Sequence, residues 1–374
     1  MRPAFSSTKQ AAAFVLLLLV LLVLPVVMGK NLLPTRAEVY ASQSWGTAAW
    51  PWIQQQIFEE TNDIDIVFLG SSHLIQGIDA PLMQAELGEK LGRPAVVRTL
   101  SWGGAGFDGL YLVAQDLLEH RKVRQLVFYD EHVDGSDKKH GGAIPYLFRF
   151  SDHASSLRGL PFAEKGVYYF AALMGLPINL LGLIRPAIPA EPYADRPDYL
   201  KPKDQTFSAA PERLGSISAL AGFNANLLIP ENAPFVSFTP TVTNELVAHV
   251  YTVAQPDTNF EFSATPLPAW QAHFARQFGR LAESHGCQLV LLDLPTLETV
   301  RNTGIHERAF WLQLISTNLP LVGVPAQQMF GRLSNDEILK LYSDQAHLNK
   351  NGQDYFTPLI APVLINLYEA AFAH

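Results

Sequence analysis

The chain has 374 residues, 48% of them hydrophobic, and a formal net charge of −8 at pH 7. This length allows one large core, or a core with a substantial insertion. Acidic and basic residues are interspersed without the Lys/Arg runs typical of nucleic-acid binding, so we exclude nucleic acid as a partner.

The first notable segment is a run without charged residues at positions 11–29, flanked by Lys9 and Lys30. Such a run is long enough to cross a bilayer. A cleavable signal peptide is the alternative, although its apolar part is usually shorter. We therefore expect a signal anchor in residues 1–32, a linker and first helix in residues 33–61, and a remainder that is periplasmic or extracellular. Basic residues on the two flanks nearly balance, which leaves the orientation open.

Helix-like and strand-like segments alternate after the anchor. The pattern predicts helices at 46–60, 81–91 and 108–120, and buried strands at 65–69, 95–100 and 125–129. It resumes with a helix at 268–285, a strand at 288–292, and helices at 306–318 and 352–371. This alternation predicts a doubly wound parallel α/β sheet, formed by residues 62–134 and 267–374.

Residues 135–266 have a different, proline-rich texture and are expected to form an inserted cap over the carboxyl ends of the strands. Within them, residues 166–184 carry no charge. We expect two short packed helices broken at Pro177, with an interfacial or partner-docking surface as the alternative. A second membrane span is excluded if Ser72 and His347 act together, because it would separate them.

A serine and a late histidine carry the chemistry. Ser72 follows the first predicted strand, and Asp344 precedes His347 by three residues. Each pattern alone is common in turns and helix caps. Together they supply a hydroxyl, a base and a carboxylate that orients the base. A metal site is the competing interpretation, but the histidines His73, His132, His140, His153 and His347 lack the spacing of metal ligands.

These motifs resemble those of the SGNH (GDSL-like) hydrolase superfamily. Gly70-Ser71-Ser72 with Gly77 is similar to its first block, and Asp344 with His347 is similar to its last. The resemblance implies a flavodoxin-like sheet with Ser72 as nucleophile, His347 as base and Asp344 as the residue that orients it. It implies neither a metal nor another cofactor.

An oxyanion hole is expected from the backbone of Ser72, from Gly104 in the loop after the second strand, and from His132. The usual third block of the family has an asparagine, whereas this chain has Tyr129-Asp130-Glu131-His132. Losing one oxyanion donor typically lowers the rate by ~10²–10³. His132, when protonated, is the candidate replacement, because Glu131 cannot donate a hydrogen bond when ionised.

Ser71 in the usual Asp position, combined with an anchor, resembles the members of that superfamily that serve cell-envelope polysaccharide or teichoic-acid acylation beside membrane-bound O-acyltransferases. We predict a serine-dependent O-acyl (acetyl) esterase or acyltransferase that acts on an envelope glycan through an acyl-Ser intermediate. The alternative is a catalytically impaired scaffold that binds a membrane-bound O-acyltransferase. The missing asparagine favours the scaffold, whereas Ser72, Asp344 and His347 oppose it. The lone Cys287 begins a buried strand and is expected to be a structural thiol.

Overall fold

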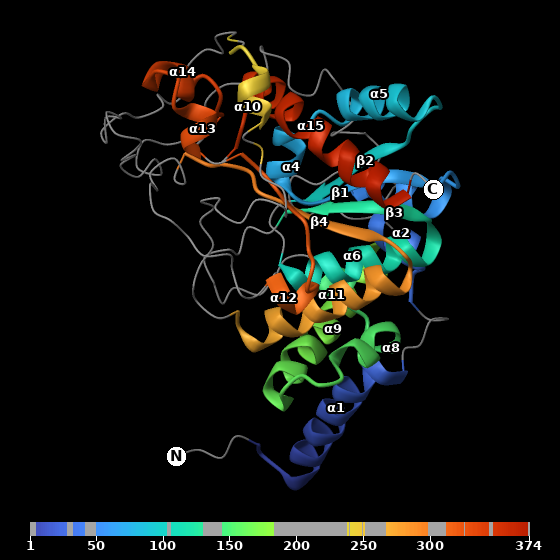
Figure 1. The fold of residues 1–374 in the computed structure, drawn as a ribbon. Coiled ribbons are helices and arrows are strands. Elements are labelled where there is room, and N and C mark those ends of the chain that lie inside the picture. Colours follow the sequence, from blue (N-terminus) through green and yellow to red (C-terminus); the bar gives the residue numbers. More distant parts are fainter. Residues whose placement is uncertain are drawn as a thin grey trace.

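Five parallel strands form the centre of the computed structural model (Figure 1). The strands are β1 (Ile64–Ser71), β2 (Val97–Trp102), β3 (Val123–Phe128), β4 (Gln288–Leu292) and β5 (Leu321–Val322). Their order is β2-β1-β3-β4-β5, the order of flavodoxin-like doubly wound sheets. The structure describes residues 5–27, 33–41, 50–102, 106–129, 144–182, 238, 240–248, 250, 267–297, 312–324, 326–343 and 347–372.

Two hydrophobic layers explain why these strands are buried on both faces. Ile66 and Phe68 of β1 point into one layer, with α5 (Ala80–Leu91) and α15 (Lys350–Phe372). Val67 and Leu69 point into the other, with α6 (Phe107–His120) and α11 (Ala269–Ser284). All eight residues of β1 are buried, as expected for a central strand covered by helices on both sides.

Most of the predicted elements are confirmed within a few residues: β1 to β4, α5, α6, α11 and α15. The described part of the predicted helix 46–60 consists of α3 (Trp50–Gln54) and a π-helical turn, η1 (Gln55–Glu59). For the predicted helix 306–318, the described part is helical only in α12 (Leu312–Ile315). Outside the insertion, the elements that were not predicted are short: α2 (Arg36–Ala41), α4 (Ser72–Gly77), β5, α13 (Ala326–Phe330) and α14 (Asn335–Leu339).

The described part of the insertion forms a third helical layer. Its elements are α7 (Ile144–Leu147), α8 (Phe150–His153), η3 (Ala154–Leu157) and α9 (Phe162–Gly182), with α10 (Asn244–Ala248) placed against α15 instead. Tyr168 donates a hydrogen bond to Asp108 of α6 (2.9 Å), and the Nε2 atom of His273 on α11 lies 2.6 Å from the Ser156 carbonyl oxygen. Residues 144–182 therefore cover α6 and α11 (Figure 1) and not the strand ends. Most of the remaining residues of the expected cap at 135–266 lie outside the described residues, so the cap stays a prediction.

The expected break at Pro177 is wrong, because α9 continues through this residue as one helix. Proline removes one backbone donor from a helix. The side-chain amide of Asn179 donates to the Gly175 carbonyl (2.9 Å) and provides an additional hydrogen bond in the same turn. The buried face of α9 also packs on the domain, which offsets the cost of the missing donor.

The amino-terminal apolar segment forms α1 (Thr8–Val27), followed after a gap by α2 (Arg36–Ala41). Among the described residues, one helix is long and apolar enough to cross a membrane, and it is α15 rather than α1. Half of the most apolar window of α15 is buried against the sheet, which is typical of a core helix in a globular domain. In α1 the apolar helix is taken as Thr8–Leu24, which is slightly shorter than the 18 residues needed for a candidate membrane span. Membrane anchoring by α1 therefore stays a prediction.

Candidate active site

The hydroxyl of Ser72 and the imidazole of His347 meet at the carboxyl end of β1. Ser72 is the first residue of α4, and its Oγ lies 2.7 Å from Nε2 of His347. β1 has β2 on one side and β3 on the other, so Ser72 follows the strand at which the order of the sheet reverses. Doubly wound sheets bind ligands at this point. In the tautomer that leaves Nε2 unprotonated, the Ser72 hydroxyl donates a hydrogen bond to Nε2 of His347.

Asn349 fixes the loop that carries His347. Its side-chain amide donates to the carbonyl oxygens of Lys340 (2.9 Å) and Tyr342 (3.1 Å), and its Oδ1 accepts from the backbone of Asn351 (2.9 Å). The His347 carbonyl accepts a backbone hydrogen bond from Ser343 (2.8 Å). Because Asn349 is buried, these bonds are shielded from competition with water. The backbone on both sides of His347 is thereby held in place.

Hydrogen bonds join the start of α15 and the segment before it to α4 and its carboxyl end. Gln353 donates to the Ile78 carbonyl (2.9 Å), and the hydroxyl of Ser343 donates to Gln76 of α4 (2.9 Å). A Cβ atom at Gly352 would lie 2.2 Å from the Leu341 carbonyl oxygen, so this close approach requires glycine. These contacts join the segment that carries Ser72 to the segment that carries His347, although the two are 275 residues apart.

His73, which the sequence suggested only as a possible metal ligand, is a neighbour of His347. Its ring stacks on that of His347 with centroids 4.4 Å apart and an interplanar angle of 22°. Its Nδ1 lies 3.1 Å from the Ser71 hydroxyl oxygen, and its ring also contacts the ring of Tyr129, with centroids 5.0 Å apart. The stacking restrains the plane of the His347 ring. No local sequence motif predicts that His73 stacks on His347, because Tyr129 and His347 come from other parts of the chain.

Asp293 places a carboxyl group at the same edge of the sheet. It follows β4, and its backbone N–H donates to Val322 (2.8 Å). Through β3, the register aligns Leu69 with Leu291, so Asp293 lies level with Ser71 and two strand spacings away, about 10 Å. Burial raises the pKa of the Asp293 carboxyl to about 7. Carboxyl groups that titrate near neutrality are typical of functional sites.

The raised pKa of Asp293 predicts a pH-dependent gain in stability for Asp293→Asn. Above pH 7 the folded protein holds a partly buried carboxylate that water solvates fully in the unfolded chain. The substitution removes this cost and should raise the free energy of unfolding at pH 8 by at most about 4 kcal/mol, the equivalent of raising the pKa from 3.8 to about 7. The gain should shrink as the pH falls from 7 to 4, where the folded protein already binds the proton. Denaturant unfolding at pH 8 and pH 5 measures the difference.

The exposed Asp63 provides a matched control, because Asp63→Asn neutralises a carboxylate at the surface. It should change the free energy of unfolding by less than about 0.5 kcal/mol at either pH. An equal effect of Asp293→Asn at the two pH values would show that Asp293 does not take up a proton on folding.

Three of the predicted site residues, Asp344, Gly104 and His132, lie outside the described residues. Within the described part of the chain, no three His, Cys, Asp or Glu side chains are grouped so that they could hold a metal ion. His153 is buried, and its Nδ1 receives the backbone N–H of Arg149 (2.9 Å). It belongs to the packing of α8 rather than to the site at Ser72.

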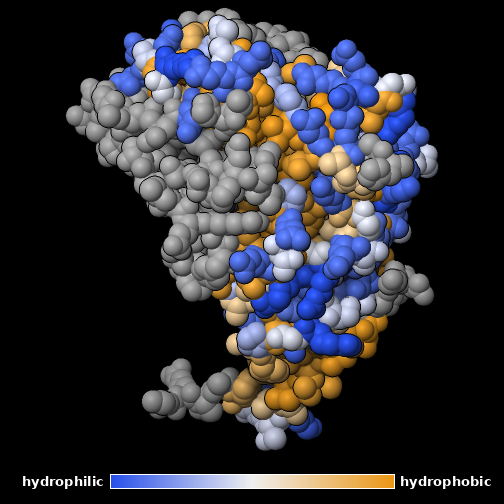
Figure 2. Space-filling model, in the orientation of Figure 1, coloured by the Kyte–Doolittle hydropathy of each residue, from blue (hydrophilic) through white to orange (hydrophobic). Residues whose placement is uncertain are grey.

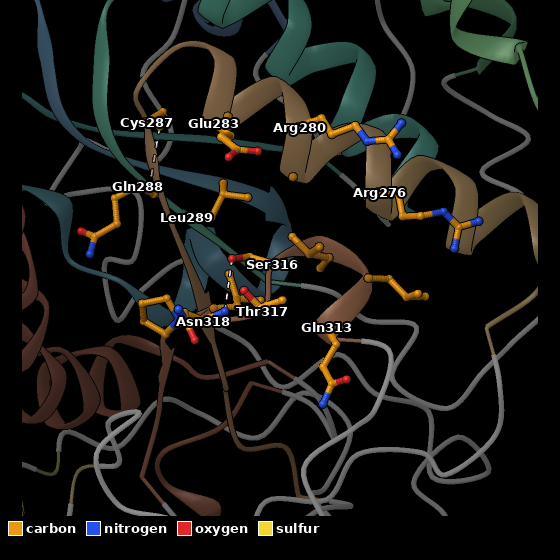
Figure 3. Close-up of a pocket in the computed structure, with 16 residues that line it drawn as sticks. Arg276, Arg280, Glu283, Cys287, Gln288, Leu289, Gln313, Ser316, Thr317 and Asn318 are labelled. Carbon is orange, nitrogen blue, oxygen red and sulfur yellow. Dashed lines mark hydrogen bonds between the residues drawn. The ribbon is translucent and has the colours of Figure 1, made fainter.

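A pocket of about 550 Å³ lies at the other edge of the sheet (Figure 3). Gln288 begins β4 and Pro320 precedes β5, and both line this pocket together with Arg276 and Arg280 of α11. The pocket thus lies at the amino-terminal ends of β4 and β5, whereas Ser72 follows the carboxyl end of β1. Cys287 also lines it, and burial raises the pKa of this thiol to about 12, which supports a structural role.

Comparison of the chain with protein-family models found no matching family, and comparison with curated proteins found no relative.

Proposed function

We propose that this chain is a serine-dependent O-acyl esterase or acyltransferase of the SGNH type. The observation that carries the proposal is the 2.7 Å distance between Ser72 Oγ and His347 Nε2. A hydroxyl and an imidazole at hydrogen-bond distance, at the ligand-binding edge of a doubly wound sheet, supply a nucleophile and its base.

The proposed reaction has two steps. Ser72 Oγ attacks the carbonyl carbon of an ester while its proton moves to His347 Nε2. Collapse of the tetrahedral intermediate breaks the bond to the leaving alcohol, which takes the proton from His347, and leaves an acyl-Ser72 ester. In the second step, water or a glycan hydroxyl loses its proton to His347 and attacks the acyl carbon. Collapse of this second tetrahedral intermediate breaks the bond from the acyl carbon to Ser72 Oγ, which takes the proton back from His347, and releases the acid or the acylated glycan.

The oxyanion of each tetrahedral intermediate requires hydrogen-bond donors. We assign the backbone N–H of Ser72 to this role, because the first N–H groups of a helix have no partner inside the helix. Gly104 and His132 are the other proposed donors. Asp344 is proposed to orient His347, as the resemblance to the SGNH superfamily implies.

The proposed substrate is an acylated envelope glycan or its acyl donor, handled at a membrane surface. Two features support this choice: the apolar helix α1, and the resemblance of Gly70-Ser71-Ser72 to the anchored proteins of envelope acylation. A membrane-bound O-acyltransferase is the proposed partner. Both the hydrolytic and the transfer reaction pass through the same acyl-Ser72 ester and differ only in the attacking hydroxyl.

Trapping the acyl-enzyme tests the proposal. The full chain in detergent is mixed with an activated acetyl ester, quenched in acid and digested. Mass spectrometry should find one acetyl group on the peptide that contains Ser72, and hydroxylamine should remove it. A chain that gives neither a burst of the leaving group nor an acetylated Ser72 peptide would favour the non-catalytic scaffold.

A further inference from the structure

Helix α9 has apolar residues on both of its faces. Its inner face carries buried residues such as Tyr168 and Ala172, which pack on the domain. Its outer face carries a row of exposed apolar side chains at helical spacing: Val167 (44% exposed), Phe170 (60%), Met174 (49%) and Leu181 (48%). A surface helix of a water-soluble domain normally has polar residues on the outer face. The outer row of α9 is therefore suited to a non-aqueous contact.

The outer row lies beside a second apolar surface. Helix α1 contacts α9 and α8, and its large side chains from Phe14 to Val27 are almost all exposed. Figure 2 shows hydrophobic surface gathered at the end of the molecule where α1 lies. No charged residue occurs in α9 after Lys165 or in α1 after Lys9. Helix α1 and the outer row of α9 thus form one region without charge.

The inner face keeps α9 on the domain. Tyr168 donates to the buried Asp108 of α6 (2.9 Å). A Cβ atom at Gly175 would lie 1.9 Å from the Pro145 carbonyl oxygen, so α9 packs on α7 at backbone distance. A helix held in this way cannot leave the domain to cross a bilayer alone. It is instead placed to lie along a surface.

We infer that α9 lies in the interfacial region of the bilayer that holds α1, with its outer row of apolar side chains in contact with lipid. The inference rests on the proposed membrane attachment of α1. A protein interface normally includes a polar rim and hydrogen bonds. The outer row offers neither, and it continues the surface of the proposed anchor, so lipid is the occupant that fits both features.

This placement also sets the height of the site. From the bilayer outward, α9 comes first, then α6 and α11, and then the sheet (Figure 1). Two layer spacings place the sheet about 20 Å from α9. The carboxyl edge with Ser72 then faces along the membrane rather than away from it. An acyl group delivered by a membrane-embedded donor would reach Ser72 from the side.

Lipid-dependent fluorescence quenching tests this placement. The variants Phe170→Cys and Met174→Cys of the full chain are labelled at the introduced thiol with an environment-sensitive dye, and each protein is reconstituted into phosphatidylcholine vesicles that contain acyl-chain nitroxides. Emission from both positions should fall by about half or more, as expected for groups at the depth of interfacial helices. Wild type measures any labelling of the buried Cys287.

Two further labels separate the possible failures. A cysteine at Leu17 reports whether α1 is in the bilayer, and one at Glu89 on α5 is the control on the opposite side of the domain (Figure 1). Quenching at Leu17 with no quenching at Phe170 and Met174 would keep the anchor and overturn the inference. Iodide in the aqueous phase is a second quencher. If neither the lipid nitroxides nor iodide quench the labels at positions 170 and 174, protein covers the outer row, and the inference is also overturned. No quenching at Leu17 would refute the anchor itself. None of these outcomes depends on Ser72 chemistry.

Discussion

Replacement of Ser72 by alanine is expected to abolish the acyl-enzyme and to lower the turnover of an activated acetyl ester by about 10³-fold or more. The substitution removes the hydroxyl that lies 2.7 Å from Nε2 of His347, the proposed base. His347→Ala should lower turnover to a similar degree, because Ser72 then has no acceptor for its proton. The double variant should be no slower than the slower single variant, since the two side chains act as one unit. Initial rates and burst amplitudes measure all three.

An exposed serine provides the matched control. Ser284 lies at the end of α11, and its hydroxyl donates to the Leu281 carbonyl (2.8 Å) at the surface. Ser284→Ala should keep the wild-type rate. Circular dichroism of each variant shows whether the fold is retained. A folded Ser72→Ala protein that turns over the ester at the wild-type rate would remove Ser72 from the mechanism and leave the scaffold as the better description.

The fold was predictable where a single segment carries the whole signal. β4 is a continuous apolar run, which is typical of a strand covered on both faces. β5 was missed because it has two residues and is defined only by its pairing with Leu291 and Leu292. The sequence around Pro177 predicts a break because proline interrupts isolated helices. Helix α9 continues through Pro177 because packing on α6 and α7 stabilises it.

The site was predictable only in part for a related reason. Ser72 and His347 stand in motifs of neighbouring residues, and the structure brings their side chains together. The stacking of His73 on His347 and the level of Asp293 depend on strand order and on the loop before α15. Nothing in the residues next to Asp293 indicates that β4 ends two strands from Ser72. Such neighbours appear only once the sheet is assembled.

A buried charge pair attaches the segment after α1 to the domain. Arg36 of α2 donates from Nε to Asp116 of α6 (3.1 Å) and from Nη1 to the Leu147 carbonyl (2.6 Å), and its Nη2 forms an ion pair with Asp116. Tyr40 donates to the same carboxylate (2.7 Å). Burial acts to raise the pKa of Asp116, but the Arg36 charge and these hydrogen bonds outweigh it and lower the pKa.

Asp116→Asn is therefore expected to lower the free energy of unfolding by about 3–5 kcal/mol at pH 7. The amide keeps the shape of the side chain but leaves the buried Arg36 guanidinium without a counter-charge. The exposed pair of Arg332 and Glu245, with N···O at 2.6 Å, is the matched control. Glu245→Gln should cost no more than about 1 kcal/mol, because solvent screens that pair. Denaturant unfolding of the full chain in detergent measures both.

The cost of Asp116→Asn should also depend on pH with a defined sign. A carboxylate whose pKa is lower in the folded protein stabilises it fully above the unfolded pKa, near 4, and loses that contribution as the pH falls through the folded pKa. Wild type and variant should thus converge only in strong acid. Equal unfolding midpoints at pH 7 would show that Arg36 and Asp116 do not hold α2 on α6. If Asp116→Asn lowers the free energy of unfolding at pH 7 as expected but leaves the Ser72 ester chemistry intact, the attachment of α2 to α6 is not needed for catalysis.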